Sequence, residues 1–251
     1  MSNYKTDAIV LRTYDFKDYD RIIVLYSKDR GLIRAVAKGV KNPKSKLRGR
    51  LEPLMASGLI LYEGRNLDSI SQCDTIESFK HLRKDLKKIT YAMYFAELAS
   101  AFGVENDPQS EYFYNFIFNS LKELETSDEN VILETLIVNY SYKLISWAGY
   151  KPVFDYCGQC RSKILTSTDI CFNTDSGMAV CPDCSSKNAN LTCLPQNLYQ
   201  YLLNLAGISS FPFNLDVNTV TKAHSLLFEY IDKKSNYKLK TPKLIETLCL
   251  S

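Results

Sequence analysis

The chain has 251 residues, of which 45% are apolar and 24% are charged, and its formal net charge is +3. This balance is typical of a globular protein with a buried core, built as one large domain or two to three small ones, and it excludes a protein that is basic throughout. No apolar stretch approaches the roughly 18 residues of a membrane-spanning helix, and the first residues lack the apolar segment of a signal peptide, so we expect a cytoplasmic protein.

The N-terminal third has the pattern of β-strands. Five short segments are rich in β-branched and aromatic residues and are bounded by turn signals; they are 4–13, 21–27, 32–37, 58–62 and 67–75. In the third segment a period of two places Ile33, Ala35 and Ala37 on one face. Five strands in so small a unit favour a closed barrel, which has no exposed edges. We expect a barrel of the OB type; an SH3-like barrel has the same number of strands.

Positive charge is concentrated in this part of the chain. Residues 1–75 contain 14 Lys and Arg against 9 Asp and Glu, whereas the remaining residues contain 17 against 19. The N-terminal third therefore produces a local positive field, not a general one.

Beyond residue 80 the period of the apolar residues changes from two to nearly four, which is typical of helices. Three helices are expected between residues 80 and 150, the first ending at Gly103 and the third at Gly149, and helical spacing returns at 198–205 and 220–231. Wide apolar stripes on these helices indicate a small bundle. The basic segment 233–243 is expected to be a mobile tail.

Four of the eight cysteines have the spacing of metal-binding knuckles. Cys157 and Cys160 enclose two residues, as do Cys181 and Cys184, and 20 residues separate the pairs. Four thiolates around Zn²⁺ make a closed, structural site, and the segment has too few large apolar residues to stay folded by burial alone. We therefore expect one structural Zn²⁺. The alternatives are a redox dithiol, an iron–sulfur cluster and a site that has lost its metal.

The other cysteines, Cys73, Cys171, Cys193 and Cys249, lie outside this spacing. In a reducing compartment such residues are usually small, buried and apolar in character. Replacement of one of the paired ligands by Cys171 or Cys193 is the alternative.

These elements predict an α+β protein, in which an N-terminal OB-type five-stranded β-barrel is followed by a helical bundle with an inserted zinc lobe that holds its ion with four cysteines. The expected domains are residues 1–78 for the barrel and 79–251 for the helical part, with the zinc lobe at about 150–193.

We expect no enzymatic activity, because no catalytic pattern stands out. The two histidines, His81 and His224, belong to no metal-binding motif, and the chain has no phosphate-binding glycine loop or nucleophile elbow. Three carboxylates after the first strand would suit a metal-dependent nuclease, but the basic residues among them favour a solvated turn; they are Asp15, Asp18 and Asp20.

The sequence KGVKNPKSKLRGR occupies residues 38–50, between the third and fourth expected strands, and contains no acidic residue. With Arg34 on the preceding strand, its cations would suit the phosphates of nucleic acid; the expected DNA contacts are Arg34, Lys38, Lys41, Lys44, Lys46, Arg48 and Arg50. Nearby aromatic residues that would stack on unpaired bases are Tyr14, Phe16, Tyr19 and Tyr62. A solvated loop without a ligand is the plain alternative.

Taken together, the chain resembles the RecO recombination-mediator proteins of bacteria. The resemblance covers most of the chain and rests on the N-terminal strands, the helical middle and the sequences CGQC and CPDC. Its most specific part is the segment 37–54, which carries a K-G-x-x-x-x-K-S-x-L-like loop after the third strand. Some members of that family lack the cysteines, and this chain keeps all four.

This resemblance implies a non-enzymatic role in homologous recombination and DNA repair. Members of the family bind single- and double-stranded DNA, anneal complementary strands and help to load the recombinase onto DNA coated with single-strand-binding protein (SSB). The implied partners are DNA, RecR, the acidic C-terminal tail of SSB and, indirectly, the recombinase filament, in the cytoplasm at the nucleoid. The alternatives are an RNA-binding OB protein, a zinc-dependent nuclease and a zinc-containing scaffold whose loop meets an acidic partner.

Overall fold

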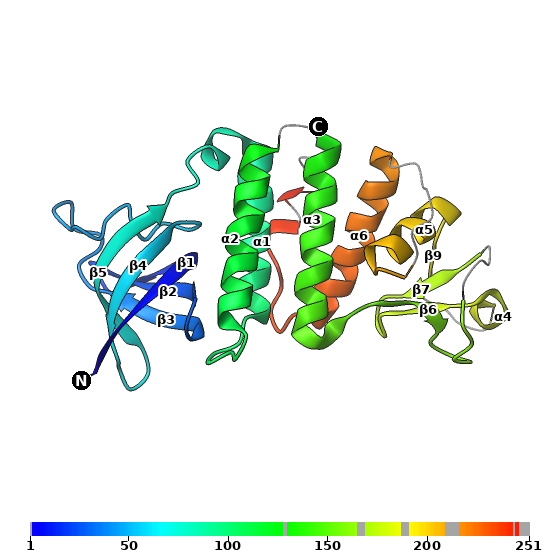
Figure 1. Ribbon diagram of the computed structural model, residues 1–251, viewed down its shortest axis with the longest axis horizontal. Coiled ribbons are helices and arrows are strands. Elements are labelled where there is room, and N and C mark those ends of the chain that lie inside the picture. Colours follow the sequence, from blue (N-terminus) through cyan, green and yellow to red (C-terminus); the bar gives the residue numbers. More distant parts are fainter. Residues whose placement is uncertain are drawn as a thin grey trace. The chain divides into compact units, whose positions relative to one another are not determined.

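Figure 1 shows the computed structural model, which describes residues 2–127, 130–164, 169–186, 191–208, 216–242 and 244–245. The chain folds into two compact units. The first contains residues 1–127 and the chain from residue 240 onward, and the second contains residues 128–239. Each unit combines strands with helices, and the sequence-based domain boundary at residue 78 stays a prediction.

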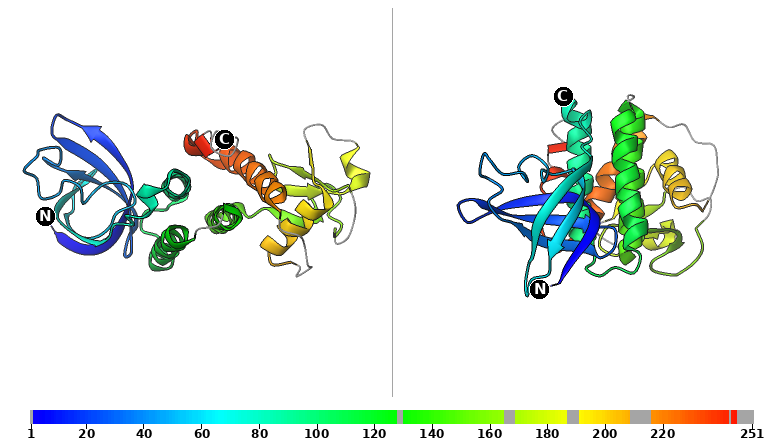
Figure 2. Two further views of the ribbon diagram at one scale, coloured as in Figure 1. Left: turned by 90° about the horizontal axis from the view of Figure 1, so that it is seen from above. Right: turned by 60° about the vertical axis from the view of Figure 1, so that its left-hand side comes forward.

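The first five strands form a closed barrel (Figure 2). They are β1 (Asn3–Phe16), β2 (Asp20–Ser27), β3 (Gly31–Ala37), β4 (Ala56–Tyr62) and β5 (Asp68–Glu77). Their order around the barrel is β1-β2-β3-β5-β4, and β4 pairs back onto β1. The β3–β5 pairing is parallel and short, whereas the other neighbours are antiparallel. The predicted α+β class and the predicted five-stranded barrel of the OB type are therefore confirmed.

Strand β1 is buried on both faces. Ala8 and Val10 point into the barrel core, together with the three residues of β3 that the period of two placed on one face. Ile9 and Leu11 lie on the opposite face of β1 and are also fully buried. This second face is buried because helix α1 packs against it.

Helices α1 (Leu86–Phe102) and α2 (Ser110–Thr126) cover the outside of β1, β2 and β3 (Figure 2). Tyr26 of β2 is fully buried there; its ring lies 4.6 Å from the ring of Phe113, and its hydroxyl donates to Asp107 at 2.8 Å. Burial and this hydrogen bond raise the pKa of Tyr26. The first helix ends at Gly103 as predicted, but it begins at Leu86, because Asp85 caps it after a short 3₁₀ turn.

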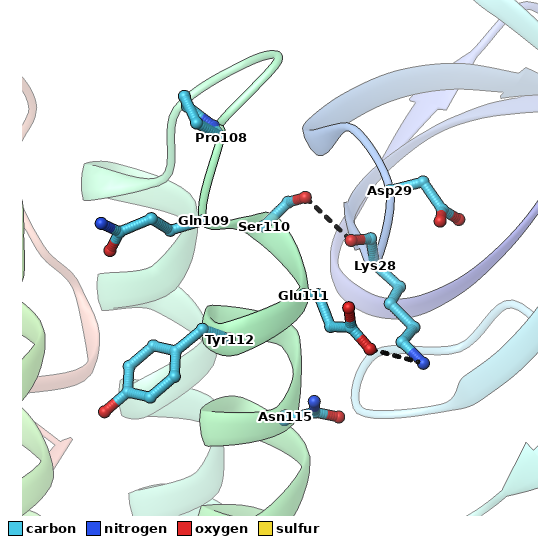
Figure 3. Close-up of a pocket in the computed structure, with 8 residues that line it drawn as sticks. All are labelled: Lys28, Asp29, Pro108, Gln109, Ser110, Glu111, Tyr112 and Asn115. Atoms are coloured by element: carbon cyan, nitrogen blue, oxygen red, sulfur yellow. Dashed lines mark hydrogen bonds and ion pairs between the residues drawn. The ribbon is translucent and has the colours of Figure 1, made fainter.

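The hairpin between β2 and β3 is joined to the start of α2 by two contacts (Figure 3). Ser110 Oγ donates to the carbonyl oxygen of Lys28 at 2.8 Å, and Lys28 Nζ pairs with Glu111 at 3.1 Å. They border an open hollow of about 810 Å³, which is also lined by Asp29, Pro108, Gln109, Tyr112 and Asn115. Asp29 in turn accepts a hydrogen bond from Thr6, so the two charged residues of the hairpin, Lys28 and Asp29, are both engaged within the protein. The hollow therefore lies where the β2–β3 hairpin packs against the start of α2, and its charged residues are already engaged within the protein.

Among its described residues, the second unit combines three longer helices with a small sheet (Figure 1). The helices are α3 (Asn130–Ile145), α5 (Gln196–Leu205) and α6 (Val217–Lys234); α3 and α5 both pack on α6. The sheet has the order β6-β8-β7-β9 and is formed by β6 (Val153–Cys157), β7 (Cys171–Asn173), β8 (Met178–Val180) and β9 (Thr192–Cys193). A short helix, α4 (Pro182–Ser185), follows β8. Gly149 has a φ of 88° in the turn Ser146–Tyr150 after α3, which agrees with its predicted role at the end of that helix.

The small sheet has an aromatic core that composition did not reveal. Phe154 and Phe172 are fully buried, with ring centroids 5.3 Å apart, and their rings also meet Tyr142 of α3 and Tyr230 of α6. The hydroxyl of Tyr199 on α5 donates to backbone carbonyls of the lobe. The helices of the same unit thus supply apolar partners that the segment lacks by itself. That burial alone cannot keep the segment folded stays a prediction.

The expectation of a mobile tail is wrong for the described part of the segment 233–243. Lys233 lies in the last turn of α6 and pairs with Glu229 at 3.0 Å. Further along, the backbone N–H groups of Lys240 and Thr241 donate to the carboxylate of Glu97 on α1, at 3.1 and 2.9 Å. Glu97 is buried, so these hydrogen bonds satisfy a charge that burial would otherwise destabilise. Lys243 lies outside the described residues.

No helix among the described residues is long and apolar enough to cross a membrane.

We predict that Gly31→Ala destabilises the first unit more than Gly39→Ala. Both glycines have a positive φ, of 68° and 62°, so both substitutions carry a backbone strain of about 1–3 kcal/mol. A Cβ at Gly31 would also lie 2.3 Å from the carbonyl oxygen of Val104, whereas nothing lies within 4 Å of one at Gly39. The close contact should add about 1–3 kcal/mol to the loss at Gly31, measured by chemical denaturation. Equal losses in the two variants would contradict this packing.

Candidate nucleic-acid surface and metal centre

The basic loop between β3 and β4 is a chain of consecutive turns. Backbone hydrogen bonds link Asn42 to Gly39, Ser45 to Asn42 and Arg48 to Ser45, at 2.9–3.2 Å. Its start is tied to the β1–β2 turn, because the N–H of Gly39 donates to Asp20 Oδ1 at 2.8 Å. The backbone of the loop is therefore ordered by its own local bonds.

Apolar side chains anchor this loop in the barrel. Val40 and Leu51 are 5% and 2% exposed and belong to the barrel core, against which Leu47 also packs. Sequence reasoning passed over these residues, although their apolar character among so many cations was a visible signal. Because the apolar residues point inward, the charged residues between them are left at the surface.

The seven predicted contact residues fall into two groups. Arg34, Lys41 and Arg50 each form an ion pair, with Glu105, Asp15 and Asp74 respectively, at 3.0–3.5 Å. The other four are exposed and form no ion pair within the described part of the chain; they are Lys38, Lys44, Lys46 and Arg48. The charge available to a ligand therefore lies at Lys38 and in the segment from Lys44 to Arg48.

Two of the three carboxylates near the first turn, Asp15 and Asp20, bind residues of this loop. Asp15 pairs with Lys41 at 3.0 Å and with Arg21 at 3.5 Å, and the hydrogen bond from Lys41 lowers the pKa of Asp15. Asp20 accepts the N–H of Gly39, and Asp18 is exposed. Among the described residues, the sole group of side chains placed to hold a metal is a set of cysteines elsewhere.

The face that OB barrels commonly use for oligonucleotides, on strands 2 and 3, is largely covered in this protein. Tyr26 and Leu32 on that face are buried against α1 and α2, and Arg34 at its margin pairs with Glu105. The barrel therefore presents the β3–β4 loop, more than the strand face, to a large ligand.

The aromatic residues considered for base stacking lie at different ends of β1. Tyr14, Tyr19 and Tyr62 are 46%, 64% and 42% exposed. Tyr19 is next to the basic loop, since its carbonyl accepts the N–H of Lys41 at 3.0 Å. Tyr62, by contrast, pairs with Asn3 at the far end of the strand, about 12 residues or about 40 Å of extended chain away. Tyr19 therefore lies beside the basic loop, and Tyr62 lies far from it along β1.

The metal-binding knuckles are brought together by the small sheet. Cys157 ends β6 and Cys181 follows β8, and these two strands are paired. The N–H of Gly158 donates to the carbonyl oxygen of Ala179 at 2.8 Å. A Cβ at Gly158 would lie only 2.9 Å from Met178 Cβ, so this close approach of the two strands requires glycine. Pairing of β6 with β8 thus places knuckles that are 20 residues apart in sequence next to each other.

All four knuckle sulfur atoms lie within 4.8 Å of one another, and those of Cys160 and Cys181 are 3.8 Å apart. Tetrahedral Zn²⁺ with Zn–S bonds of about 2.3 Å requires sulfur atoms about 3.8 Å apart. The donor set therefore fits a four-thiolate site for such an ion.

Electrostatics also favours a cation here. Burial opposes ionisation of Cys157, but backbone N–H groups of Cys181, Cys160 and Gln159 outweigh it and lower its pKa to about 6. At Cys184, the hydrogen bond with Cys181, burial and the other sulfur atoms raise the pKa to about 12. Four thiolates so close together cannot all ionise unless a positive ion compensates them.

The cysteines outside the knuckles are only partly as expected. Cys73 and Cys171 are buried, which agrees with the prediction, but Cys193 is exposed, because it ends the edge strand β9. Neither Cys171 nor Cys193 belongs to the sulfur cluster of the knuckles. Cys249 lies outside the described residues. His81 is exposed, and His224 is buried in α6 against Phe228.

Comparison with known proteins gives the family. Residues 1–79 match the family model described as Recombination protein O N terminal, and residues 83–243 match Recombination protein O C terminal. The chain belongs to the RecO family. The resemblance inferred from the loop and the cysteines is thereby confirmed.

Relatives in this family match over most of their length. A DNA repair protein RecO from Desulforamulus reducens is 30% identical over 99% of this chain and 96% of its own length. One from Pelotomaculum thermopropionicum is 36% identical over 76% of this chain and 72% of its own. One from Shouchella clausii is 26% identical over 97% of this chain and 94% of its own.

We predict that Cys160→Ser removes bound metal and that Cys193→Ser does not. The first substitution deletes one of four thiolates, whereas the second changes a cysteine of the same lobe outside the cluster. The wild type and Cys193→Ser should retain about one Zn²⁺ per chain by elemental analysis, and Cys160→Ser should retain far less and melt at a lower temperature. Equal metal content in the two variants would reject this ligand set.

Proposed function

We propose that this RecO-family chain acts in DNA repair and homologous recombination as a non-enzymatic mediator that binds DNA without sequence preference. The observation that carries the proposal is the anchored loop with four exposed cations, Lys38, Lys44, Lys46 and Arg48, whose charges no described carboxylate compensates. Its support from the comparisons is that the relatives are named DNA repair proteins.

The loop suits phosphate groups better than base edges. Long Lys and Arg side chains on a series of turns reach outward as separate charges, and such contacts give affinity without reading sequence. Tyr19, 64% exposed beside the loop, adds a surface on which an unpaired base would stack. Both features favour single-stranded DNA and tolerate duplex DNA.

Annealing follows from the same charges. Two complementary strands repel each other through their phosphates, and a loop that neutralises several phosphates lowers this repulsion while the strands pair. On this proposal the protein needs no catalytic residue. We further propose RecR, the acidic C-terminal tail of SSB and, indirectly, the recombinase filament as its partners, in the cytoplasm at the nucleoid.

The metal centre has a structural role in this proposal. One Zn²⁺ held by Cys157, Cys160, Cys181 and Cys184 would have no open coordination position, and such sites stabilise folds without activating water. The ion would crosslink the two knuckles, which lie at the ends of the paired strands β6 and β8.

We predict that DNA binding depends strongly on salt concentration and that the cations of the loop cause this dependence. If four cations each neutralise one phosphate of a single strand, the log–log slope is about −3, and affinity falls roughly 50-fold between about 50 and 200 mM salt. The triple variant with Lys44→Glu, Lys46→Glu and Arg48→Glu should weaken binding to all sequences alike and reduce the slope to about −1, measured by fluorescence anisotropy.

A matched control keeps the change in charge and moves it elsewhere. Lys84, Lys143 and Lys151 are exposed, and their replacement by Glu alters the net charge by the same amount. This control should keep most of the affinity and the slope. A loop variant that binds as the control does would place the DNA contacts outside the loop.

We predict that the wild type anneals complementary oligonucleotides, with and without bound SSB, and that the loop variant does not. The reason is that annealing depends on the loop charges that screen phosphates. The pairing of the strands is monitored through the quenching of a fluorescent label.

The same experiment, with RNA of the same sequence as competitor, distinguishes the alternative functions. Tighter binding to the RNA would favour an RNA-binding protein, and absence of binding to either nucleic acid would favour a scaffold. Cleavage of the DNA in the presence of Mg²⁺, Mn²⁺ or Zn²⁺ would show a nuclease.

A further inference from the structure

Two cysteines outside the metal centre face each other across strands β7 and β9. Cys171 and Cys193 are register partners in this antiparallel pair, and their sulfur atoms are 2.8 Å apart. The N–H of Leu194 donates to the carbonyl of Ile170 at 2.8 Å, so the next pair along, Cys171 with Cys193, is a non-hydrogen-bonded pair. Side chains approach each other most closely at such pairs, which is the arrangement that a disulfide between strands requires.

The two thiols differ in access to solvent. Cys171 is 4% exposed, whereas Cys193 lies at the sheet edge and is exposed. A small-molecule disulfide can therefore reach Cys193 first, and Cys171 is already in place to attack the mixed disulfide that forms there. Burial, followed by the neighbouring Cys193 thiol, raises the pKa of Cys171 to about 11. Once Cys193 is modified, its thiol no longer contributes to the raised pKa of Cys171.

We propose that Cys171 and Cys193 form a reversible intrachain disulfide by exchange with a small-molecule disulfide. The Cys193 thiolate attacks one sulfur of that molecule, its S–S bond breaks, and one thiolate leaves. The Cys171 thiolate then attacks the Cys193 sulfur of the mixed disulfide, and the second thiolate leaves. The two protein thiols lose two electrons and two protons, and the small disulfide takes them up as two thiols.

The position of this bond ties it to the metal lobe. Cys171 and Cys193 bracket the stretch of chain that contains Cys181 and Cys184. A bond between them closes this stretch into a loop and fixes the two-residue strand β9 to β7. Because a closed loop loses less conformational entropy when it folds, the second knuckle stays near its folded position when metal is absent. In a reducing compartment the bond is present only under oxidising conditions, so it is a modification and not a permanent crosslink.

The test uses the zinc-loaded full-length chain treated with oxidised glutathione, followed by alkylation of the remaining thiols and mass spectrometry. Before alkylation, the wild type should be about 2 Da lighter than the untreated chain, without retained glutathione. After alkylation and digestion, the crosslinked peptide should contain Cys171 and Cys193. Dithiothreitol should restore both thiols. Cys171→Ser should instead retain one glutathione on Cys193, and Cys193→Ser should form neither product at Cys171.

Buried Cys73 in the barrel is the internal reference and should be alkylated only after denaturation. If the wild type retains glutathione at Cys193, or if the crosslink joins knuckle cysteines, the proposal is wrong. The oxidised chain should also release zinc to a chelator about tenfold more slowly than the reduced chain. Equal release rates would overturn the link between this bond and the metal lobe.

Discussion

The basic loop shares its hydrophobic core with the barrel, and this shared burial determines where the loop's charges lie. Val40 and Leu51 are buried among the side chains of the strands, and Leu47 packs against the same core. Desolvation of a lysine or arginine is costly, so the residues between these anchors must point to solvent. A loop with the same cations but without its anchors would have no fixed outer side. The apolar residues therefore shape this basic surface as much as the charged ones do.

Ion pairs then divide the charged residues by role. Lys41 and Arg50 meet carboxylates of the barrel, and exposed pairs of this kind contribute little stability but fix side-chain position. The other loop cations have no such partner among the described residues, so their charge remains available to an anionic ligand. The face of β2 and β3 is largely covered by α1 and α2, so this part of the barrel surface is closed to a large ligand.

The metal lobe depends on a different constraint, the repulsion of like charges. Its four sulfur atoms are so close that a cation must accompany their ionisation, and the backbone N–H groups around Cys157 already favour its thiolate. At the same time, Phe154 and Phe172 join the lobe to helices of its own unit. A metal ion held by these sulfur atoms would thus add to the aromatic packing of the same small sheet. The facing cysteines on β7 and β9 lie at its outer edge, where only a covalent bond would add a comparable tie.

The sequence alone determined the five barrel strands, the order of the longer helices, the knuckle cysteines and the basic loop, but not the four strands of the small sheet. Each of these depends on local signals: a period of two or nearly four, glycines at turns, fixed Cys spacing and a run of like charge. Tertiary structure decided which cations are free, since Arg34, Lys41 and Arg50 meet carboxylates that are distant in sequence. It also decided that the basic segment after α6 is held by Glu97 and that Cys193 is exposed beside Cys171. Such contacts join residues far apart along the chain, and no local pattern specifies them, because packing of whole elements sets which surfaces meet.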